Sequence, residues 1–293
     1  METNFLTDLL LPVSLAVIMF GMGLSLVPGD FKRIALYPKA AALGILNQII
    51  LLPVVGFLLL LLIPMQNPEL AVGIMILAAC PGGPTSNLIS HISKGDTALS
   101  ISLTAISSLI VVVTIPLIVN FSLQYFLRHG EYVPLPVLDT IVSVIVITLL
   151  PVSLGMLIHA RYPLFAGKMN KPVKIMSGVL LFVIIAAVII NDKENILNFF
   201  AQAGPVALAL NVVMLLIGYV SARLMNLQVS QSITISIESG IQNGTLGIAI
   251  AATLLRNSTM TISPAIYSLI MFLTAGVIIA FMNLKFREVK QVA

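Results

Sequence analysis

One acidic side chain, Glu238, stands inside a long apolar stretch of the sequence. Moving a carboxylate into lipid is costly, so an acid at that depth is by default a candidate functional group. The plainer alternative is a protonated structural glutamate held by hydrogen bonds. No lysine or arginine is expected inside a neighbouring apolar stretch to neutralise the charge. An ionised Glu238 therefore most simply requires a bound cation.

Oxygen-bearing side chains recur in other apolar stretches and could complete a cation site. Ser100 and Thr104 stand at positions i and i+4, which places both on one helix face. Taken singly, a serine or threonine in a membrane helix usually bonds only its own backbone. Taken together, amide and hydroxyl oxygens around one carboxylate favour a hard cation over a transition metal. The other candidates are Gln48, Ser86, Asn87, Gln242 and Asn243.

Other chemistries have little support in the sequence. His91, His129 and His159 fall towards the ends of apolar stretches or between them and do not cluster at metal-ligand spacing. Cys80 is the only cysteine, which excludes an intrachain disulfide and a cysteine-based metal cluster. No nucleophilic side chain stands beside a general base inside the apolar stretches, so we do not expect an enzyme. The basic residues form no dense patch, which argues against a nucleic-acid partner.

The elements that must position these residues are membrane helices. Of 293 residues, 59% are hydrophobic and 9% are charged, whereas a soluble domain has about 25% charged residues. A span needs about 20 mainly apolar residues. The sequence therefore predicts an all-α polytopic membrane protein whose partner is the lipid bilayer. The nine expected spans are roughly 5–27, 40–63, 69–93, 96–127, 137–160, 172–191, 202–226, 229–255 and 262–286.

The basic residues predict the orientation of these spans. If the spans are counted as above, twelve lysines and arginines fall on one side and only Arg128, Lys193 and Arg256 on the other, with none inside a span. Because cytoplasmic loops carry the excess of basic residues, the N-terminus is expected outside and the C-terminus in the cytoplasm. We expect a multi-pass protein of the cell (inner) membrane. Acids rather than bases precede the first apolar run, so a cleavable signal peptide is not expected.

Two expected spans are interrupted near their middles. The third contains CPGGPTSN at 80–87, and the eighth contains SIESGIQNG at 236–244. The two spans lie five apart in the order of spans, and an odd offset means that they cross the bilayer in opposite directions. This predicts an inverted-topology repeat with two crossing discontinuous helices. Both second half-helices would begin at the midplane, where free N–H groups attract an anion. One carboxylate with two monovalent cations leaves a single positive charge, which a monoanionic substrate could balance.

Three motifs are similar to those of a known family. FGMGLSLVPGDFKR, CPGGPTSNLISHISKGDTALS and IESGIQNGTLGIAIA resemble the bile acid:sodium symporter family, and the likeness covers about residues 12–280. Bacterial relatives often have ten spans. The chain is identified as a prokaryotic-type member with nine expected spans, a number that resembles the animal form. The resemblance implies a panel domain at 1–38 and 137–198 and a core domain at 39–136 and 199–293.

The same resemblance implies two sodium ions and the residues that hold them. The first set uses side-chain oxygens only, whereas the second also uses the backbone carbonyls of Ser239 and Ile241. Position 239 is commonly valine in the family, and because only its carbonyl would bind sodium, the serine here is expected to leave sodium binding unaffected. The first implied site is Ser86, Asn87, Ser100, Thr104 and Glu238. The second implied site is Gln48, Glu238, Ser239, Ile241 and Gln242.

The substrate positions depart further from the family pattern. Pro84 and Thr85 stand where bacterial relatives often have Thr-Ala, and Met271-Phe272 replaces a His-Asn pair. Another His-Asn pair is replaced around Leu215. These departures leave open whether the substrate is a bile acid or a smaller carboxylate. The expected substrate-contacting residues are Pro84, Thr85, Ser86, Asn243 and Gly244.

We therefore expect a sodium-coupled importer of an organic anion that works by alternating access and requires no oligomer. The first alternative is a proton-coupled carrier or exchanger in which Glu238 titrates. The second is a membrane receptor or channel that performs no coupled transport.

Overall fold

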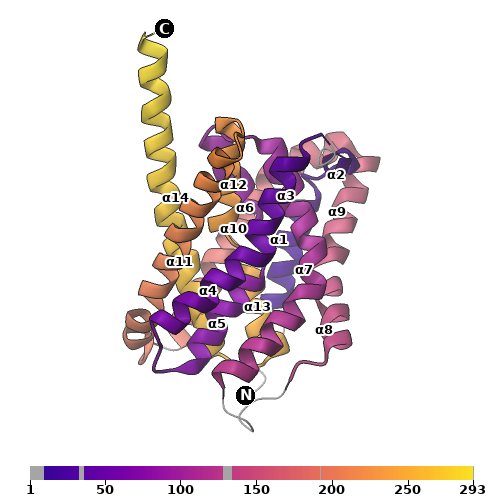
Figure 1. Ribbon diagram of the computed structural model, residues 1–293. Coiled ribbons are helices and arrows are strands. Elements are labelled where there is room, and N and C mark those ends of the chain that lie inside the picture. Colours follow the sequence, from indigo (N-terminus) through magenta and orange to yellow (C-terminus); the bar gives the residue numbers. More distant parts are fainter. Residues whose placement is uncertain (1–9, 33–35, 128–133, 192, 293) are drawn as a thin grey trace.

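The computed structural model describes residues 10–32, 36–127, 134–191 and 193–292, and the regular elements in these ranges are helices (Figure 1). Six helical segments are long and apolar enough to cross a bilayer. They are α3–η3–α4 (Pro38–Leu46, Asn47–Leu51, Leu52–Leu62), α7 (Thr97–Phe126), α8–η4–α9 (Val137–Val144, Ile145–Leu149, Leu150–Arg161), α10 (Pro163–Asn191), α11 (Ile196–Leu224) and α14 (Thr259–Val292).

Shorter helices complete the bundle. Apolar α1 (Leu11–Gly23) precedes the small helix α2 (Pro28–Lys32). The pair α5 (Pro68–Ala79) and α6 (Pro84–Ile92) occupies the expected third span. The pair α12 (Val229–Gly240) and α13 (Gly244–Ala249), which η5 (Ile250–Leu254) continues, occupies the expected eighth. Since these pieces are shorter than a full span, the count of nine and the internal repeat stay predictions.

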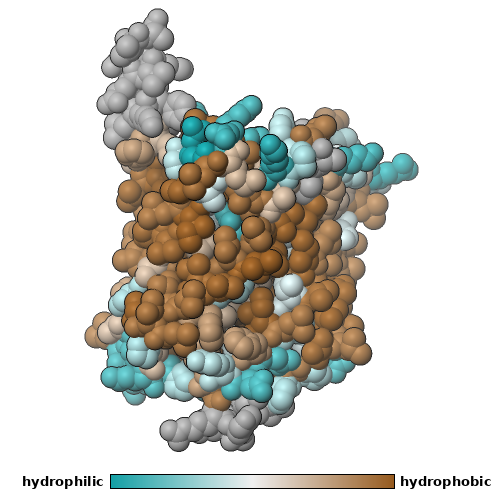
Figure 2. Space-filling view, in the orientation of Figure 1, coloured by the Kyte–Doolittle hydropathy of each residue, from teal (hydrophilic) through white to brown (hydrophobic). Residues whose placement is uncertain are grey.

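The outer surface is suited to lipid. Figure 2 shows a broad hydrophobic band across the visible face of the bundle, between two more hydrophilic ends. Large apolar side chains point outward from several helices, among them Leu58, Val113, Leu157 and Leu216, each about half exposed or more. An apolar surface of that extent would aggregate in water but is solvated by acyl chains. The chain is therefore a multi-pass membrane protein.

Glycines bring α1 into close contact with α9 and α10. A Cβ on Gly23 would collide with the carbonyl oxygen of Val152, and a Cβ on Gly155 with that of Phe20. A Cβ on Gly21 would lie 2.5 Å from Val173 Cγ1 on α10. In a membrane, small residues let helices approach until dispersion contacts hold them. The glycines of FGMG at 20–23 therefore allow this close packing.

The remaining helices pack around a second apolar cluster. Here α5 lies against α7 and α14, and α11 lies against α12 and α14. Buried side chains from α5, α11, α12 and α14 meet there, including Ile74, Leu210, Ile237 and Ile266, and α7 adds partly buried ones. This packing holds the two interrupted spans in the interior of the bundle, where backbone groups freed by the breaks are shielded from lipid.

The two breaks meet at a crossing. Pro84 begins α6, and Gly82 and Gly83 leave an extended link after α5. Gly82 forms an isolated antiparallel β-bridge with Gln242, which lies between α12 and α13. The backbone N–H of Asn243 donates to the carbonyl of Pro81 at 3.0 Å. Each break thus satisfies backbone groups of the other.

Two expectations about local structure need correction. Helix α10 begins at Pro163, earlier than the expected span at 172–191, so Lys168 and Lys171 lie on a helix and not in a loop. The statement that no basic residue lies inside a span is wrong for Lys174, which falls within the long apolar segment. Pro53 follows a π-helical turn, which accommodates the missing proline N–H without a sharp break.

Candidate cation and anion site at the helix crossing

Glu238, near the end of α12, is buried among hydroxyl groups from other segments. Its Oε1 accepts hydrogen bonds from Ser86 Oγ at 2.6 Å and Ser100 Oγ at 2.5 Å. Its Oε2 accepts from Thr104 Oγ1 at 2.9 Å. Glu238 is 3% exposed, and Ser86 and Ser100 are fully buried. Two segments, α6 and α7, therefore converge on a carboxylate carried by a third, α12.

Asn87 extends this oxygen cluster. Its Oδ1 accepts from Ser100 Oγ at 2.8 Å and from Thr104 Oγ1 at 3.2 Å. The i, i+4 spacing on α7 presents both hydroxyls to the same space, as expected from the sequence. Carboxylate, hydroxyl and amide oxygens are the ligands that hard cations prefer. The five residues expected for the first sodium site are thus neighbours, and their donor set fits a sodium ion.

Gly82 is required by the position of the carboxylate. A Cβ at this position would lie 2.7 Å from Glu238 Oε2, closer than real Cβ contacts. At the adjacent Gly83 the nearest heavy atoms would be 3.5 Å away, which is ordinary contact. The two glycines of the break therefore have different roles, because only the first admits the acid.

A second polar cluster lies at the π-helical turn of η3. Gln48 Nε2 donates to Gln242 Oε1 at 2.6 Å and to the carbonyl of Cys80 at 3.0 Å. Gln242 Nε2 donates to the carbonyl of Ser239 at 2.8 Å. Gln48 Oε1 is buried and has no hydrogen-bond partner among the described residues. A buried, unpaired amide oxygen is costly, and a cation would satisfy it.

The other members expected at the second site lie at the end of α12. Ile241 is fully buried between α12 and α13, and its N–H donates to the carbonyl of Ile237 at 2.8 Å. Ser239 uses its hydroxyl within the protein, donating to the carbonyl of Ile235 at 2.7 Å. The serine hydroxyl is thus occupied within the protein, and the role expected for the Ser239 carbonyl stays a prediction.

Sequence reasoning missed the residues that support the broken end of α12. The carbonyl of Gly240 accepts from Asn211 Nδ2 and Tyr267 Oη, both at 2.8 Å. Asn47 Nδ2 also donates to Ser239 Oγ at 3.3 Å. Asn211 and Tyr267 are fully buried. A polar residue deep in an apolar stretch was the available signal, but it does not tell which distant carbonyl the side chain reaches.

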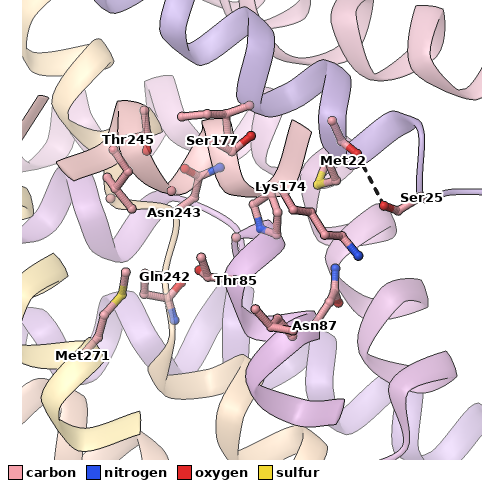
Figure 3. A pocket seen from close by; sticks show the side chains of 18 of the residues that line it. Met22, Ser25, Thr85, Asn87, Lys174, Ser177, Gln242, Asn243, Thr245 and Met271 are labelled. Atoms are coloured by element: carbon pink, nitrogen blue, oxygen red, sulfur yellow. Dashed lines mark hydrogen bonds between the residues drawn. The ribbon is translucent and has the colours of Figure 1, made fainter. Parts of the chain in front are cut away.

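A cavity of about 520 Å³ lies beside the crossing (Figure 3). Four of the five expected substrate residues line it: Pro84, Thr85, Asn243 and Gly244. Ser86, the fifth, is not among the lining residues and faces Glu238 instead. Asn243 Oδ1 accepts from the backbone N–H of Leu246 and so caps α13, which leaves its Nδ2 free to donate.

The apolar part of the cavity wall includes positions that differ from the resembled pattern. Met271 and Phe272 line it, so the replacement of the His-Asn pair makes this wall apolar. Leu215 packs near Gly240 and does not reach the cavity. A ligand in this space would meet polar groups at the crossing and hydrocarbon elsewhere, a common composition for small-molecule sites.

Comparison with known proteins identifies the family of this chain. The Sodium Bile acid symporter family matches residues 12–199, which is more than half of the sequence. The chain belongs to this family. Its members and the relatives below are transporters and not enzymes.

Similar proteins come from bacteria, plants and animals. "Uncharacterized sodium-dependent transporter YocS" of Bacillus subtilis is 30% identical over 239 residues, covering 82% of this chain and 72% of the relative. "Probable sodium/metabolite cotransporter BASS2, chloroplastic" of rice is 32% identical over 285 residues, covering 96% of this chain and 64% of the relative. The human "Ileal sodium/bile acid cotransporter" is 28% identical over 302 residues, covering 96% and 82%. The chain thus spans less than two thirds of the rice relative's length.

Proposed function

We propose that this protein is a symporter that couples the entry of sodium to the transport of an organic anion by alternating access. The observation that carries the proposal is the convergence of Ser86, Ser100 and Thr104 on Glu238. The names of relatives from three kingdoms support the choice of sodium. An acid in this setting, with no basic side chain among its hydrogen-bond partners, is matched in charge by a cation.

Sodium binding would join segments that are far apart in the sequence. A sodium ion near Glu238 takes oxygens from α6, α7 and α12, and the hydroxyl protons that now point at the carboxylate turn away from the ion. A second ion near Gln48 and Gln242 uses the unpaired Gln48 Oε1 and the carbonyls at the end of α12. Both ions therefore stabilise one arrangement of the crossing, which is the condition for coupling.

The anion would bind on the cavity side of the same crossing. The N-terminal end of α6, where a helix carries partial positive charge, lies at the cavity near Thr85, and Asn243 Nδ2 offers a side-chain donor. Two sodium ions and one carboxylate leave a net positive charge, so a monoanion gains most from loading after sodium. The substrate is bile-acid-like or a smaller monocarboxylate.

We further propose how the chain moves and how it lies in the membrane. Nine spans place the N-terminus outside and the C-terminus in the cytoplasm of a cell-membrane protein. Spans 1, 5 and 6, from residues 1–38 and 137–198, form a panel. Residues 39–136 and 199–293 form a core that contains both crossing helices and shifts against the panel during alternating access.

The direct test is uptake into proteoliposomes across a panel of monocarboxylates that includes steroid acids and small hydroxy acids. We expect uphill accumulation that requires an inward sodium gradient and depends cooperatively on sodium. Glu238→Gln should abolish sodium-driven uptake while the protein still reaches the membrane. Normal sodium dependence in this variant would remove Glu238 from the site, and non-cooperative, electroneutral uptake would contradict two ions.

Proton coupling is the second candidate, favoured by one observation. Both oxygens of Glu238 accept hydrogen bonds from hydroxyl groups, an environment that also suits a carboxyl group that gains and loses a proton. Replacing sodium by choline at a fixed pH gradient separates the two. Retained uptake supports proton coupling, and lost uptake supports sodium. A receptor or channel would accumulate nothing against a gradient.

A further inference from the structure

Helix α10 brings one cationic side chain to the cavity wall. Lys174, Ser177 and Leu181 all line the cavity, and their spacing places them on one face of the helix. Lys174 is the only lysine or arginine among the described lining residues, which include no aspartate or glutamate. The described lining therefore offers Lys174 no carboxylate with which to form an ion pair. The cavity therefore carries an excess of positive charge.

Packing on either side fixes the face that α10 turns to the cavity. The neighbouring Val173 lies against Gly21 of α1, with no room for a Cβ between them. One turn earlier, Asn170 Nδ2 donates to Ser25 Oγ at 2.9 Å. Because both contacts would be lost if α10 rotated, the position of Lys174 is built into the helix packing.

Asn87 presents a second donor to the same cavity. Its Oδ1 is turned toward Ser100 and Thr104, so its Nδ2 faces the other way. In Figure 3 the amine of Lys174 and the amide nitrogen of Asn87 point toward each other, and both residues line the cavity. Two donors that face each other without an acceptor repel. An anion with two oxygens would satisfy both at once.

We propose that the carboxylate of the transported anion binds between Lys174 Nζ and Asn87 Nδ2. The inference rests on the proposed function and specifies the ligand of that site. Apolar side chains continue the wall from this point, including Met22, Leu88, Leu181 and Phe272. The substrate class is therefore a monocarboxylate with an apolar body, and not a small, fully polar anion.

This position would couple the anion directly to sodium. Asn87 is shared, because its oxygen belongs to the cation cluster and its nitrogen belongs to the anion site. Sodium at the first site orients the amide and withdraws electron density from it, which strengthens the N–H donor. The anion in turn holds the amide in the orientation that sodium needs, as reciprocal linkage requires.

The competing explanation is that Lys174 only extends toward lipid headgroups, as membrane lysines commonly do. Lys171 provides the matched control. It is also on α10, but it lines a separate shallow hollow with Ile175 and Val179 on another face of the helix. Lys171→Met removes the same formal charge as Lys174→Met and leaves the cavity unchanged.

The experiment measures thermal unfolding of the full chain in nanodiscs. The ligands are sodium alone, then sodium with 4-phenylbutyrate or cyclohexanecarboxylate, then sodium with the corresponding primary amides. In wild type we expect stabilisation by sodium and a further increment from the carboxylates. Lys174→Met should keep the sodium effect and weaken the apparent carboxylate affinity about tenfold or more, which is about 1.4 kcal/mol or more. Lys174→Arg should retain most of the carboxylate effect.

Each outcome has a distinct meaning. Carboxylate binding that is equal in Lys174→Met and Lys171→Met overturns the anion site and leaves the proposed function standing. Sodium stabilisation without any carboxylate increment in wild type also overturns it. Absence of stabilisation by sodium itself contradicts the proposed function. Equal binding of the amides and the carboxylates overturns the role of charge.

Discussion

The substitution Gly82→Ala tests whether the carboxylate of Glu238 is held where a cation needs it. The new Cβ would lie 2.7 Å from Glu238 Oε2, and ordinary contact begins at 3.4 Å. The carboxylate must therefore retreat by about 0.7 Å, since the extended link that carries residue 82 is tied to Gln242 by the β-bridge. Metal sites tolerate deviations of about 0.2 Å in ligand distance. The displaced oxygen would no longer bind the ion.

We expect Gly82→Ala to raise the sodium concentration for half-maximal effect by about tenfold to a hundredfold, comparable to the loss of a group that orients a metal ligand. The assay is thermal stabilisation of purified protein titrated with sodium at constant ionic strength, repeated as sodium-dependent uptake. Gly83→Ala is the control, because its Cβ meets only ordinary contacts at 3.5 Å. Wild-type sodium affinity in Gly82→Ala, or equal impairment in Gly83→Ala, would refute the reasoning.

Three further substitutions separate the parts of the site and its scaffold. Gln48→Leu removes the unpaired oxygen of the second cluster. The Hill coefficient for sodium in uptake assays should then fall from about 2 towards 1. An unchanged coefficient would contradict a second ion. Tyr267→Phe removes one of two donors to the Gly240 carbonyl. It should lower the free energy of unfolding by about 1 kcal/mol in chemical unfolding while transport is retained. Abolished transport would show that Tyr267 does more than stabilise the fold. Gly155→Ala should destabilise the protein by about 1–3 kcal/mol or more in thermal unfolding, because a Cβ meets α1 backbone. Gly167→Ala, with nothing within 4 Å of its Cβ, should be neutral, and similar losses in both would argue against the close contact.

Much of the site could be predicted because its chemistry is local in the sequence. Glu238 is conspicuous as an acid in an apolar stretch, and proline and glycine mark both breaks. The i, i+4 spacing of Ser100 and Thr104 is enough to place both hydroxyls on one face, where the structure shows them bonded to the carboxylate. Ser86 and Asn87 were candidates because they are oxygen-bearing residues directly after the first break, and the structure places them beside Glu238 and Ser100.

The rest could not be predicted because it depends on how helices rotate and pack. Lys174 was counted with the loop residues although it lies inside the expected span at 172–191, and the sequence gives no sign that α10 begins as early as Pro163. Which way Lys174 then points depends on the fit of Val173 against Gly21, a contact between residues far apart in the chain. In the same way, the bond from Tyr267 to the Gly240 carbonyl requires the final arrangement of α12 and α14. The π-helical turn at 47–51, which carries Gln48, has no clear sequence signal.

The bridge between Gly82 and Gln242 has a consequence for how this protein can vary. Because the N–H of Asn243 is bonded to the carbonyl of Pro81, neither break has an independent backbone geometry. The effect of a substitution in 242–243 therefore depends on which residues occupy 81–83. The effects of such pairs on sodium affinity should be strongly non-additive, as for residues in direct contact. We therefore expect the two breaks to vary together in evolution, because a change in one is tolerated only with suitable residues in the other.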